Sequence, residues 1–276
     1  MSKSLTDEPT YETYVYVIDS QIRVKALSYN ISWASQKNIN AGSEKDFVEI
    51  CRQMNIHCFN NCKLIIEDIH NLHIIGLQEV NTDNLDEELI KKCKHLTRFC
   101  RGKFGNSTVS LIWNHEIFGD KVDERVINLK DGESRPCLFV NTTKGYQLIV
   151  AHFPWIEDQE QINIISNMIS ENSFEGSIPI VIADTNDAKT FISKDNPLKI
   201  NQYELSQGLT KDEIKQQLVS CCWHEEGHQY QSFHDTGDYI LAPDSIMVKN
   251  YIPVLYKEFF ASDHRPVVAD LIVNKQ

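Results

Sequence analysis

Short apolar runs alternate with helical patterns along most of this chain. Residues 24–29 read Val-Lys-Ala-Leu-Ser-Tyr, an alternation typical of a strand, and the run ends at Asn30. The same reasoning predicts strands at 73–77, 109–113, 178–183, 239–241 and 267–271, and a hairpin that pairs 137–141 with 147–152. Helices are predicted at about 43–54, 86–95 and 156–169, and again from Thr210 onward. This order of elements favours mixed sheets covered by helices.

The domain organisation follows from the absence of interruptions in this pattern. Residues 1–20 form a polar lead-in, and residues 21–276 contain no Pro-, Gly- or Ser-rich linker, repeat or low-complexity block. We therefore expect a single domain over 21–276. A domain of this length buries a large core without disulfides to stabilise it.

The composition is that of a folded protein with an acidic balance. Hydrophobic residues make up 41% of the chain, and 27 Lys and Arg against 39 Asp and Glu give a net charge of −12. This charge disfavours a passive nucleic-acid coat, whose affinity comes from basic residues, but it does not exclude an enzyme that handles phosphates through a metal.

The location predicted from the sequence is intracellular, either cytoplasmic or nuclear. No apolar run reaches the ~18 residues that a membrane helix needs, so we expect no stable membrane insertion. The polar N-terminal stretch lacks the features of a secretory signal. The eight cysteines are accordingly expected to be reduced thiols.

Polar residues that suit a metal or a phosphate stand at the ends of the predicted strands. Each alone is an ordinary turn or cap residue, but strands that deliver such residues to one rim build a rigid site. The set comprises Asn30, Glu79, His152, Asp184, Asn186, Asp238, Asp263 and His264.

These residue types suit metal-assisted hydrolysis of a phosphoester. Mg²⁺, or Mn²⁺ in its place, takes oxygen ligands and retains water, so the carboxylates of Glu79 and Asp263 are enough to hold it. Asp184 is the candidate base that activates the attacking water, and the Asn and His side chains are donors for the phosphate charge.

Six segments together resemble one known superfamily. LSYNISWA, IIGLQEV, IVAHFPW, VIADTNDA, DYIL and ASDHRPV occur here in the order seen in the endonuclease/exonuclease/phosphatase superfamily, and they span the chain from Asn30 to His264. The resemblance implies an α/β fold with two packed mixed β-sheets flanked by helices, the DNase I-like αββα sandwich.

The resemblance also implies roles for the metal and phosphate ligands. Glu79 matches the metal-binding glutamate of the superfamily, and Asp263 matches a second aspartate beside the metal. Asn30 matches the asparagine beside the metal and the phosphate, and Asn186 matches the asparagine that holds the phosphate. Arg135, which precedes the hairpin, is a candidate for a bidentate phosphate contact, with a structural salt bridge as the alternative.

A second group of matches concerns proton transfer. Asp184 matches the aspartate that orients or deprotonates the attacking water, although Ala183 stands where the superfamily has glycine. His264 matches the histidine that binds the scissile phosphate, and Asp238 matches the carboxylate that fixes its tautomer. His152 matches a histidine that some members use as a phosphate ligand or general acid.

Several functions remain open on the sequence. A phosphodiesterase or nuclease that acts on nucleic acid or on a tyrosyl-DNA end is the first interpretation, because Ala-Asp-Thr-Asn at 183–186 resembles the motif of tyrosyl-DNA phosphodiesterases. A phosphatase for a phosphoinositide or another small phosphoester is the second. A non-catalytic binding protein and a nuclease acting outside its cell are weaker alternatives, and the sequence leaves the oligomeric state open.

Other residues have both a functional and a structural interpretation. A basic run forms either a path for a polyanion or a solvated helix face and loop. Trp33 and Trp155 either flank the cleft, where an aromatic ring can stack on a base, or belong to the core. The cysteines and histidines of CCWHEEGH at 221–228 lack the spacing of a zinc ribbon. The basic run consists of Lys91, Lys92, Lys94, Arg98, Arg101 and Lys103.

Overall fold

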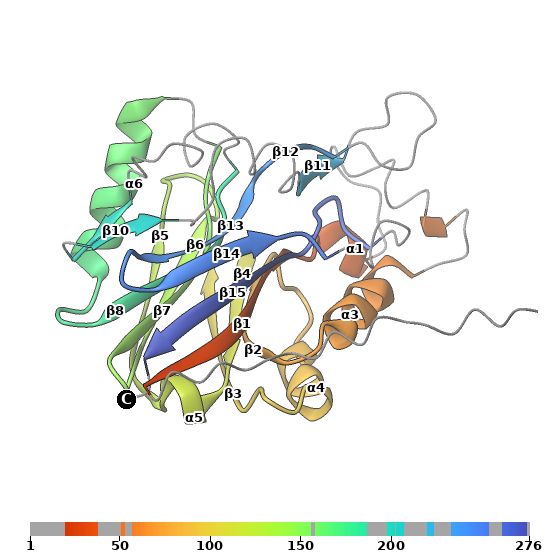
Figure 1. Ribbon diagram of the computed structural model, residues 1–276. Coiled ribbons are helices and arrows are strands. Elements are labelled where there is room, and N and C mark those ends of the chain that lie inside the picture. Colours follow the sequence, from red (N-terminus) through yellow and green to blue (C-terminus); the bar gives the residue numbers. More distant parts are fainter. Residues whose placement is uncertain are drawn as a thin grey trace, which may run out of the picture.

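Figure 1 shows the computed structural model of the chain. The structure describes residues 20–37, 51–52, 57–155, 158–186, 198–201, 203–206, 220–223, 233–253 and 261–274, with only the backbone described for 221–223 and 233–235. The predicted lead-in at 1–19, most of the helix expected at 43–54 and the helix expected from Thr210 lie outside these residues.

The first sheet has six strands in the order β14-β15-β1-β2-β4-β3. β1 is parallel to β2, whereas the other neighbours in this sheet are antiparallel. The strands are β1 (Gln21–Asn30), β2 (Leu72–Gln78), β3 (Arg98–Phe104), β4 (Ser107–Trp113), β14 (Met247–Tyr251) and β15 (Val267–Asn274).

The second sheet has seven strands in the order β5-β6-β7-β8-β13-β10-β9. β7 is parallel to β8, and the other neighbours are antiparallel. The strands are β5 (Lys121–Asn128), β6 (Pro136–Thr142), β7 (Tyr146–His152), β8 (Ile178–Asp184), β9 (Lys199–Ile200), β10 (Tyr203–Ser206) and β13 (Asp238–Pro243). A small separate sheet pairs β11 (Cys221–Trp223) with β12 (Phe233–Asp235).

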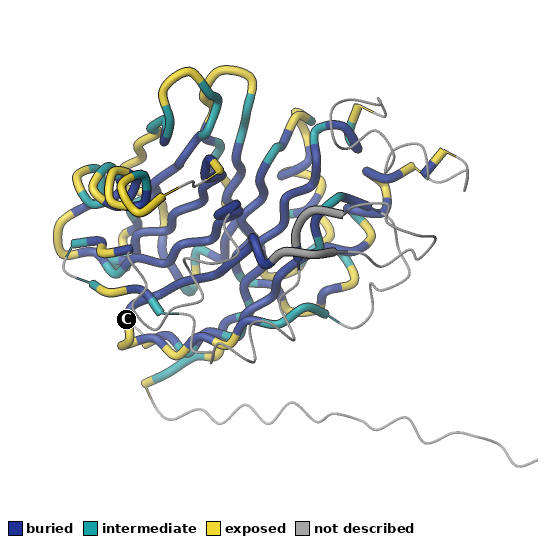
Figure 2. Tube along the Cα trace, turned by 90° about the horizontal axis from the view of Figure 1, so that it is seen from above, coloured by how far each residue is buried: buried dark blue, intermediate teal, exposed yellow. Residues whose placement is uncertain are grey.

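The two large sheets pack face to face over a continuous apolar core. Alternate residues of each strand point inward, because side chains along a strand alternate between its two faces. Val24 and Ile74 from the first sheet thus meet Val150, Ile182 and their neighbours from the second. Figure 2 shows the buried residues running along the strands, with exposed residues on the loops and on the outer side of the helix at its left edge.

Gly76 lies at a point where the two sheets approach each other closely. A Cβ atom at this position of β2 would lie 2.4 Å from Ile182 Cγ2 on β8 and 3.1 Å from Val150 Cγ2 on β7. Any larger side chain would force the sheets apart at this point, so glycine sets their local spacing.

Helices cover the two outer faces of the sandwich (Figure 1). α3 (Cys58–Asp68) and α4 (Leu85–Lys92) bury Ile66 and Leu89 against the outer face of the first sheet. α6 (Gln159–Asn172) packs Ile165 and Ile169 on the outer face of the second. Two short helices, α1 (Trp33–Lys37) and α5 (His115–Phe118), follow β1 and β4. The predicted fold class, two mixed sheets flanked by helices, is confirmed.

The predicted elements that lie in described residues are present with shifted ends. β3 was not expected, because its sequence reads as basic residues around one buried cysteine, and it forms by pairing with β4. β5 was also missed: it lies at the sheet edge and is exposed on both faces over most of its length, which leaves no apolar alternation. No helix in the described part of the chain is both long and apolar enough to cross a membrane.

Candidate active site

The polar strand ends converge at one end of the space between the two sheets. Strand register explains this arrangement: Asp184 on β8 is directly opposite His152 on β7 and Asp238 on β13. Residues in register point to the same face, and here that face is the interior of the sandwich. The residues two positions earlier on β7 and β8, Val150 and Ile182, belong to the apolar core, so each strand carries its last inward position to the site.

Asp184 is the central residue of the site. Its side chain is fully buried, and its Oδ2 atom accepts a hydrogen bond of 2.9 Å from Asn30 Nδ2, across the two sheets. Its Oδ1 atom accepts from the backbone N–H of Asn186 at 3.0 Å. Burial raises the pKa of Asp184 to about 7, despite the opposing effect of the charge on His264. A carboxylate in this range is suited to exchange a proton at neutral pH.

Glu79 follows β2 and lies at the mouth of the site, with its side chain 16% exposed. Its Oε1 atom accepts from Asn30 Nδ2 at 3.2 Å, and its Oε2 atom accepts from the backbone N–H of Trp33 at 3.0 Å. Its φ of 59° lies in the left-handed region, which is uncommon for a residue other than glycine and tends to occur at functional sites. Asn186 also has a positive φ, of 50°.

The donor set around Glu79 fits a divalent cation. Burial raises the pKa of Glu79, and the negative charge of Asp263 raises it further. Two carboxylates that repel each other in this way are held together at lower cost by a shared cation, and oxygen ligands of this type suit Mg²⁺. Asp263 accepts a 3.2 Å hydrogen bond from the Ser262 hydroxyl, which also donates to the backbone carbonyl of Asn30 at 2.7 Å.

A buried chain of hydrogen bonds holds His264. Its Nδ1 atom lies 2.9 Å from Asp238 Oδ2, and its Nε2 atom lies 3.7 Å from Asp184 Oδ2. Burial lowers the pKa of His264, but Asp238 and Asp184 outweigh burial and raise it well above the ordinary value. The imidazole is therefore protonated at neutral pH and points a positive N–H group at the centre of the site.

Asp184, Asp238 and His264 form a second set with the geometry of a metal site. One ligand atom of each lies within 4.8 Å of the others. The raised pKa of His264 argues for a proton in this set, because a charged imidazolium cannot coordinate a cation. The pair of Glu79 and Asp263 contains no protonated imidazole, so these two carboxylates are better matched to a metal ion than this second set.

His152 is a neutral side chain in this structure. Its Nε2 atom lies 2.5 Å from Arg135 Nη1, 3.7 Å from Asp184 Oδ2 and 3.8 Å from Glu79 Oε1. Burial lowers the pKa of His152 well below its ordinary value, and the charges of Arg135 and His264 lower it further. Glu133 accepts a 3.0 Å hydrogen bond from Arg135 Nε on the other side of the same guanidinium group.

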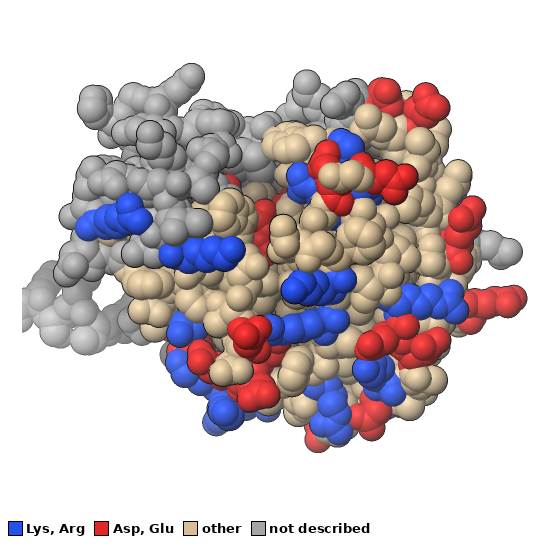
Figure 3. All heavy atoms as spheres, turned by 180° about the vertical axis from the view of Figure 1, so that it is seen from behind, with Lys and Arg blue, Asp and Glu red and all other residues tan. Residues whose placement is uncertain are grey.

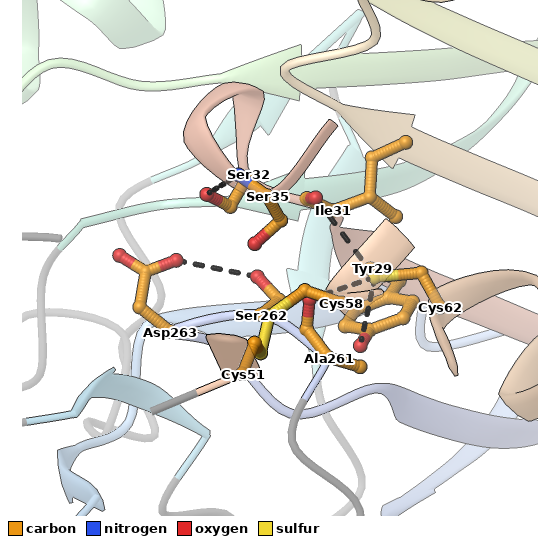
Figure 4. The surroundings of a disulfide bond; sticks show 10 residues. All are labelled: Tyr29, Ile31, Ser32, Ser35, Cys51, Cys58, Cys62, Ala261, Ser262 and Asp263. Atoms are coloured by element: carbon orange, nitrogen blue, oxygen red, sulfur yellow. Dashed lines mark hydrogen bonds between the residues drawn. A yellow bond between two sulfur atoms is a disulfide. The ribbon is translucent and has the colours of Figure 1, made fainter. Parts of the chain in front are cut away.

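Figure 4 shows a group of sulfur atoms beneath the segment that carries Asp263. Cys51 and Cys58 form a disulfide, with their Cα atoms 5.9 Å apart, so the expectation of eight reduced thiols is wrong for this pair. Their spacing of seven residues gave no hint, because the contact depends on how residues 51–52 approach the start of α3. The neighbouring Cys62 thiol donates to the Ala261 carbonyl at 3.0 Å and supports the same segment.

Sequence reasoning missed Ser220. The hydroxyl of Ser220 donates to Asp238 Oδ2 at 2.7 Å and accepts from the backbone N–H of Asp238 at 3.1 Å. Its backbone carbonyl also accepts from Arg265 N–H at 2.6 Å. A serine before an ordinary apolar run gives no signal in the sequence, because its role depends on the strand that it meets.

The basic run does not form one surface. Lys92 ends α4 and pairs with Glu67 at 2.5 Å, Arg98 on β3 pairs with Asp120 at 2.9 Å, and Arg101 pairs with the buried Asp86. Figure 3 likewise shows acidic and basic side chains intermingled over the lower part of the face that it displays. The side chains of the CCWHEEGH segment lie outside the described residues.

Comparisons with known proteins find similarity in structure only. No family model matches the chain, and no curated protein matches it. An endonuclease/exonuclease/phosphatase from Bacteroides vulgatus is 16% identical with a TM-score of 0.59, over 91% of this chain and 98% of that one. Truncated TDP2 from Caenorhabditis elegans is 13% identical with the same TM-score, over 91% of this chain and 98% of that one.

A third structure extends the range of functions found on this fold. ANGEL2, described as a 2′,3′-cyclic phosphatase and solved with adenosine-2′,3′-vanadate, is 12% identical with a TM-score of 0.59, over 93% of this chain and 97% of that one. Identities this low establish the fold rather than the activity. The chain therefore has the two-sheet fold of the endonuclease/exonuclease/phosphatase structures, as the six sequence motifs predicted.

Proposed function

We propose that this protein is a divalent-metal-dependent phosphoester hydrolase, with Mg²⁺ as the first choice of metal and a nucleic-acid phosphodiester or tyrosyl-DNA end as the first choice of substrate. The observation that carries the proposal is the geometry around Asp184. A carboxylate with a pKa near 7 lies between a protonated imidazole and the Asn30 amide, beside the carboxylate pair of Glu79 and Asp263.

Each part of this group has a role in phosphoester hydrolysis. Asp184 accepts a proton from the attacking water, because its pKa lies close to neutral pH. The protonated Nε2 of His264 donates a hydrogen bond to a phosphate oxygen. The two amide hydrogens of Asn30 are donated to Glu79 and Asp184, so Asn30 holds these two carboxylates in place beside the phosphate. Asp238 keeps His264 in the required tautomer by accepting from its Nδ1. Asn186 is a further donor, since only one of its two amide hydrogens is used by the Phe153 carbonyl.

Glu79 and Asp263 would hold the metal, which when bound stabilises negative charge on the phosphate and the leaving oxygen. Arg135 and neutral His152 lie on the opposite side of Asp184 from His264, and Arg135 contacts the phosphate or the leaving group there. His152 has too low a pKa to carry a second proton at neutral pH, and its Nε2 accepts from the Arg135 guanidinium. We therefore assign His152 the role of orienting Arg135 rather than that of a general acid.

The choice of nucleic acid is supported by ligands described for structures with this fold. A Danio rerio TDP2 structure contains a single-stranded DNA product, and ANGEL2 was solved with an adenosine derivative. A small phosphoester or phosphoinositide is the second candidate, because the roles assigned to these residues concern the phosphate, the attacking water and the leaving group, and none depends on what flanks the phosphate.

The proposal is tested by incubating the purified protein with a panel of substrates in Mg²⁺ and in EDTA. The panel contains single-stranded DNA and RNA, duplex DNA with an abasic site, a 5′-tyrosyl oligonucleotide, a 2′,3′-cyclic nucleotide, a phosphoinositide and sphingomyelin. We expect metal-dependent cleavage of a nucleic-acid member, lowered about 10²- to 10⁴-fold by Asp184→Asn, since the variant lacks the base. Cleavage of the lipid members alone would favour the second candidate.

Circular dichroism of Asp184→Asn checks that the variant remains folded. No cleavage of any member by the folded wild-type protein would contradict hydrolysis and favour a binding protein on this fold. Cleavage that persists in EDTA would contradict the proposed dependence of the reaction on a metal ion.

A further inference from the structure

A polar groove begins at the active site and leads away from it over the first sheet. Its volume is about 930 Å³. At one end Glu79, His152 and Arg135 line both the groove and the site, and at the other the groove reaches the hairpin that joins β3 to β4. The proposed hydrolysis gives a function to the end of the groove that Glu79, His152 and Arg135 line, but not to the rest of the groove.

The groove contains the two side-chain types that recognise a nucleic-acid strand. Trp33, at the start of α1, lines the wall and is held next to the site by the hydrogen bond from its backbone N–H to Glu79. The Lys37 ammonium lies 5.4 Å from the centre of the Trp33 ring. An aromatic face and a cation side by side match the alternation of base and phosphate along a strand.

The basic side chains of the groove have different tasks. Arg101 is fixed by the buried Asp86 and by the backbone carbonyl of Thr82, so it shapes the wall. Lys103, two residues further along β3, has no ion-pair partner among the residues that the structure describes, and its side chain is exposed. Lys103 is thus the cation of the basic run that is free to contact a phosphate in this groove.

We propose that this groove binds the nucleotides that flank the scissile phosphate of a single-stranded nucleic acid, with a base stacked on Trp33 and a phosphate on Lys103. The groove volume is that of a site for a small ligand, which suits one or two nucleotides rather than a duplex. Stacking on Trp33 also requires an unpaired base. The inference rests on the proposed function and names the form of its substrate.

The test is a binding titration in EDTA, where no cleavage occurs. A fluorescein-labelled oligothymidine of eight nucleotides is compared by anisotropy with an oligonucleotide of the same length that has abasic sugars, and with a duplex of that length. We expect the oligothymidine to bind most tightly. Trp33→Ala should weaken its binding by roughly 5- to 150-fold, the equivalent of one stacked base, and should remove the preference over the abasic strand.

Lys103→Gln tests the phosphate contact. The slope of log affinity against log salt concentration should become shallower by about 0.7, the value for one lost phosphate contact on a single strand. Lys249→Gln serves as the matched control, because Lys249 lies exposed on β14 at the opposite edge of the first sheet and does not line the groove. This variant should bind as the wild type does.

Three results would overturn the groove assignment. They are equal binding of the oligothymidine and the abasic strand by the wild type, tighter binding of the duplex, and groove variants that behave as the control does. The first two use only the wild-type protein, so they do not depend on the folding of a variant. Groove-dependent binding without any hydrolysis in Mg²⁺ would refute the proposed function alone, whereas hydrolysis with unaffected groove variants would refute this inference alone.

Discussion

At the residue scale, the environment of each ionisable group determines what it can do in this site. Asp184 and Asp238 are both fully buried aspartates on neighbouring strands, but they have different hydrogen-bond partners, and burial raises the pKa of Asp184 to about 7. Asp238 is hydrogen-bonded to His264 and to the Ser220 hydroxyl. Asp184 instead accepts hydrogen bonds from the Asn30 side-chain amide and the Asn186 backbone N–H, and its Oδ2 atom lies 3.7 Å from His264 Nε2. The different surroundings of the two aspartates thus suit Asp184 to act as the base and Asp238 to orient His264.

The raised pKa of Asp184 predicts how its substitution changes stability with pH. The folded state binds a proton at Asp184 that the unfolded state has lost, in the window between the ordinary value of 3.8 and about 7. The associated stabilisation is present at low pH and is lost as the pH rises through this window. Asp184→Asn carries no titrating proton.

In EDTA, the melting temperature of Asp184→Asn minus that of the wild type should therefore increase as the pH rises from about 4 to 7. Differential scanning calorimetry at several pH values measures this difference. A difference that stays constant with pH would show that Asp184 has an ordinary pKa in the folded protein.

Ser220 is predicted to position Asp238, which in turn positions His264. Ser220→Ala removes the hydrogen bond to Asp238 Oδ2, and among the described residues Asp238 Oδ1 has no hydrogen-bond partner that would hold the carboxylate instead. A bond to a charged group is worth about 1.5 kcal/mol, so kcat on the substrate found in the panel should fall about tenfold.

Ser220→Thr keeps the hydroxyl and should restore most of kcat. A loss of melting temperature with kcat unchanged would assign Ser220 a purely structural role, as would an alanine and a threonine variant with the same kcat.

At the element scale, the spacing between β2 and β8 depends on a single glycine. A methyl group at Gly76 would overlap Ile182, so Gly76→Ala should destabilise the protein by about 1–3 kcal/mol, as overpacking of a core does. Chemical denaturation measures the change. Ile182→Ala in the same protein removes the Cγ2 atom that this methyl group would overlap.

The double variant Gly76→Ala with Ile182→Ala should therefore be more stable than the sum of the two single changes predicts. Strict additivity of the two changes would contradict a direct contact between these positions.

Several elements were found from periodicity, and two of the strands that were missed, β3 and β5, share one cause. β1, β2, β7 and β8 lie inside the sheets and carry continuous or alternating apolar residues. β3 and β5 are the edge strands of the two sheets. Edge strands pair on one side only and expose charged side chains, so their sequence resembles a polar loop.

At the scale of the whole molecule, the site exists because two sheets meet. Asn30, from the first sheet, donates both to Glu79 and to Asp184 from the second. Ser262, from the segment before β15, donates to the carbonyl of the same asparagine. The candidate metal ligands Glu79 and Asp263 are 184 residues apart in a chain of 276 residues and depend on this assembly.

Metal binding should therefore stabilise the folded protein as a whole. Mg²⁺ at a hundred times its dissociation constant would add about 2.7 kcal/mol to the free energy of unfolding, because only the folded chain brings the ligands together. The melting temperature should rise with Mg²⁺ but not with KCl of equal ionic strength.

Glu79→Gln is the variant for this measurement, since it removes one charge and keeps the size of the side chain. It should shift the Mg²⁺ response to higher concentrations, and an unchanged response would place the metal elsewhere, with the Asp184, Asp238 and His264 set as the next candidate.

The sequence by itself determined the α/β class, most strands of the sheet interiors and the residues at their ends, because periodicity and residue type are local properties. It also supplied the order of six motifs from which the two-sheet fold was correctly expected. Only the tertiary structure brought the disulfide partners Cys51 and Cys58 together, revealed Ser220 behind Asp238 and separated Lys103 from the paired basic residues around it. These features depend on which strands and loops become neighbours, and the same contacts determine burial and hence the pKa values of the site.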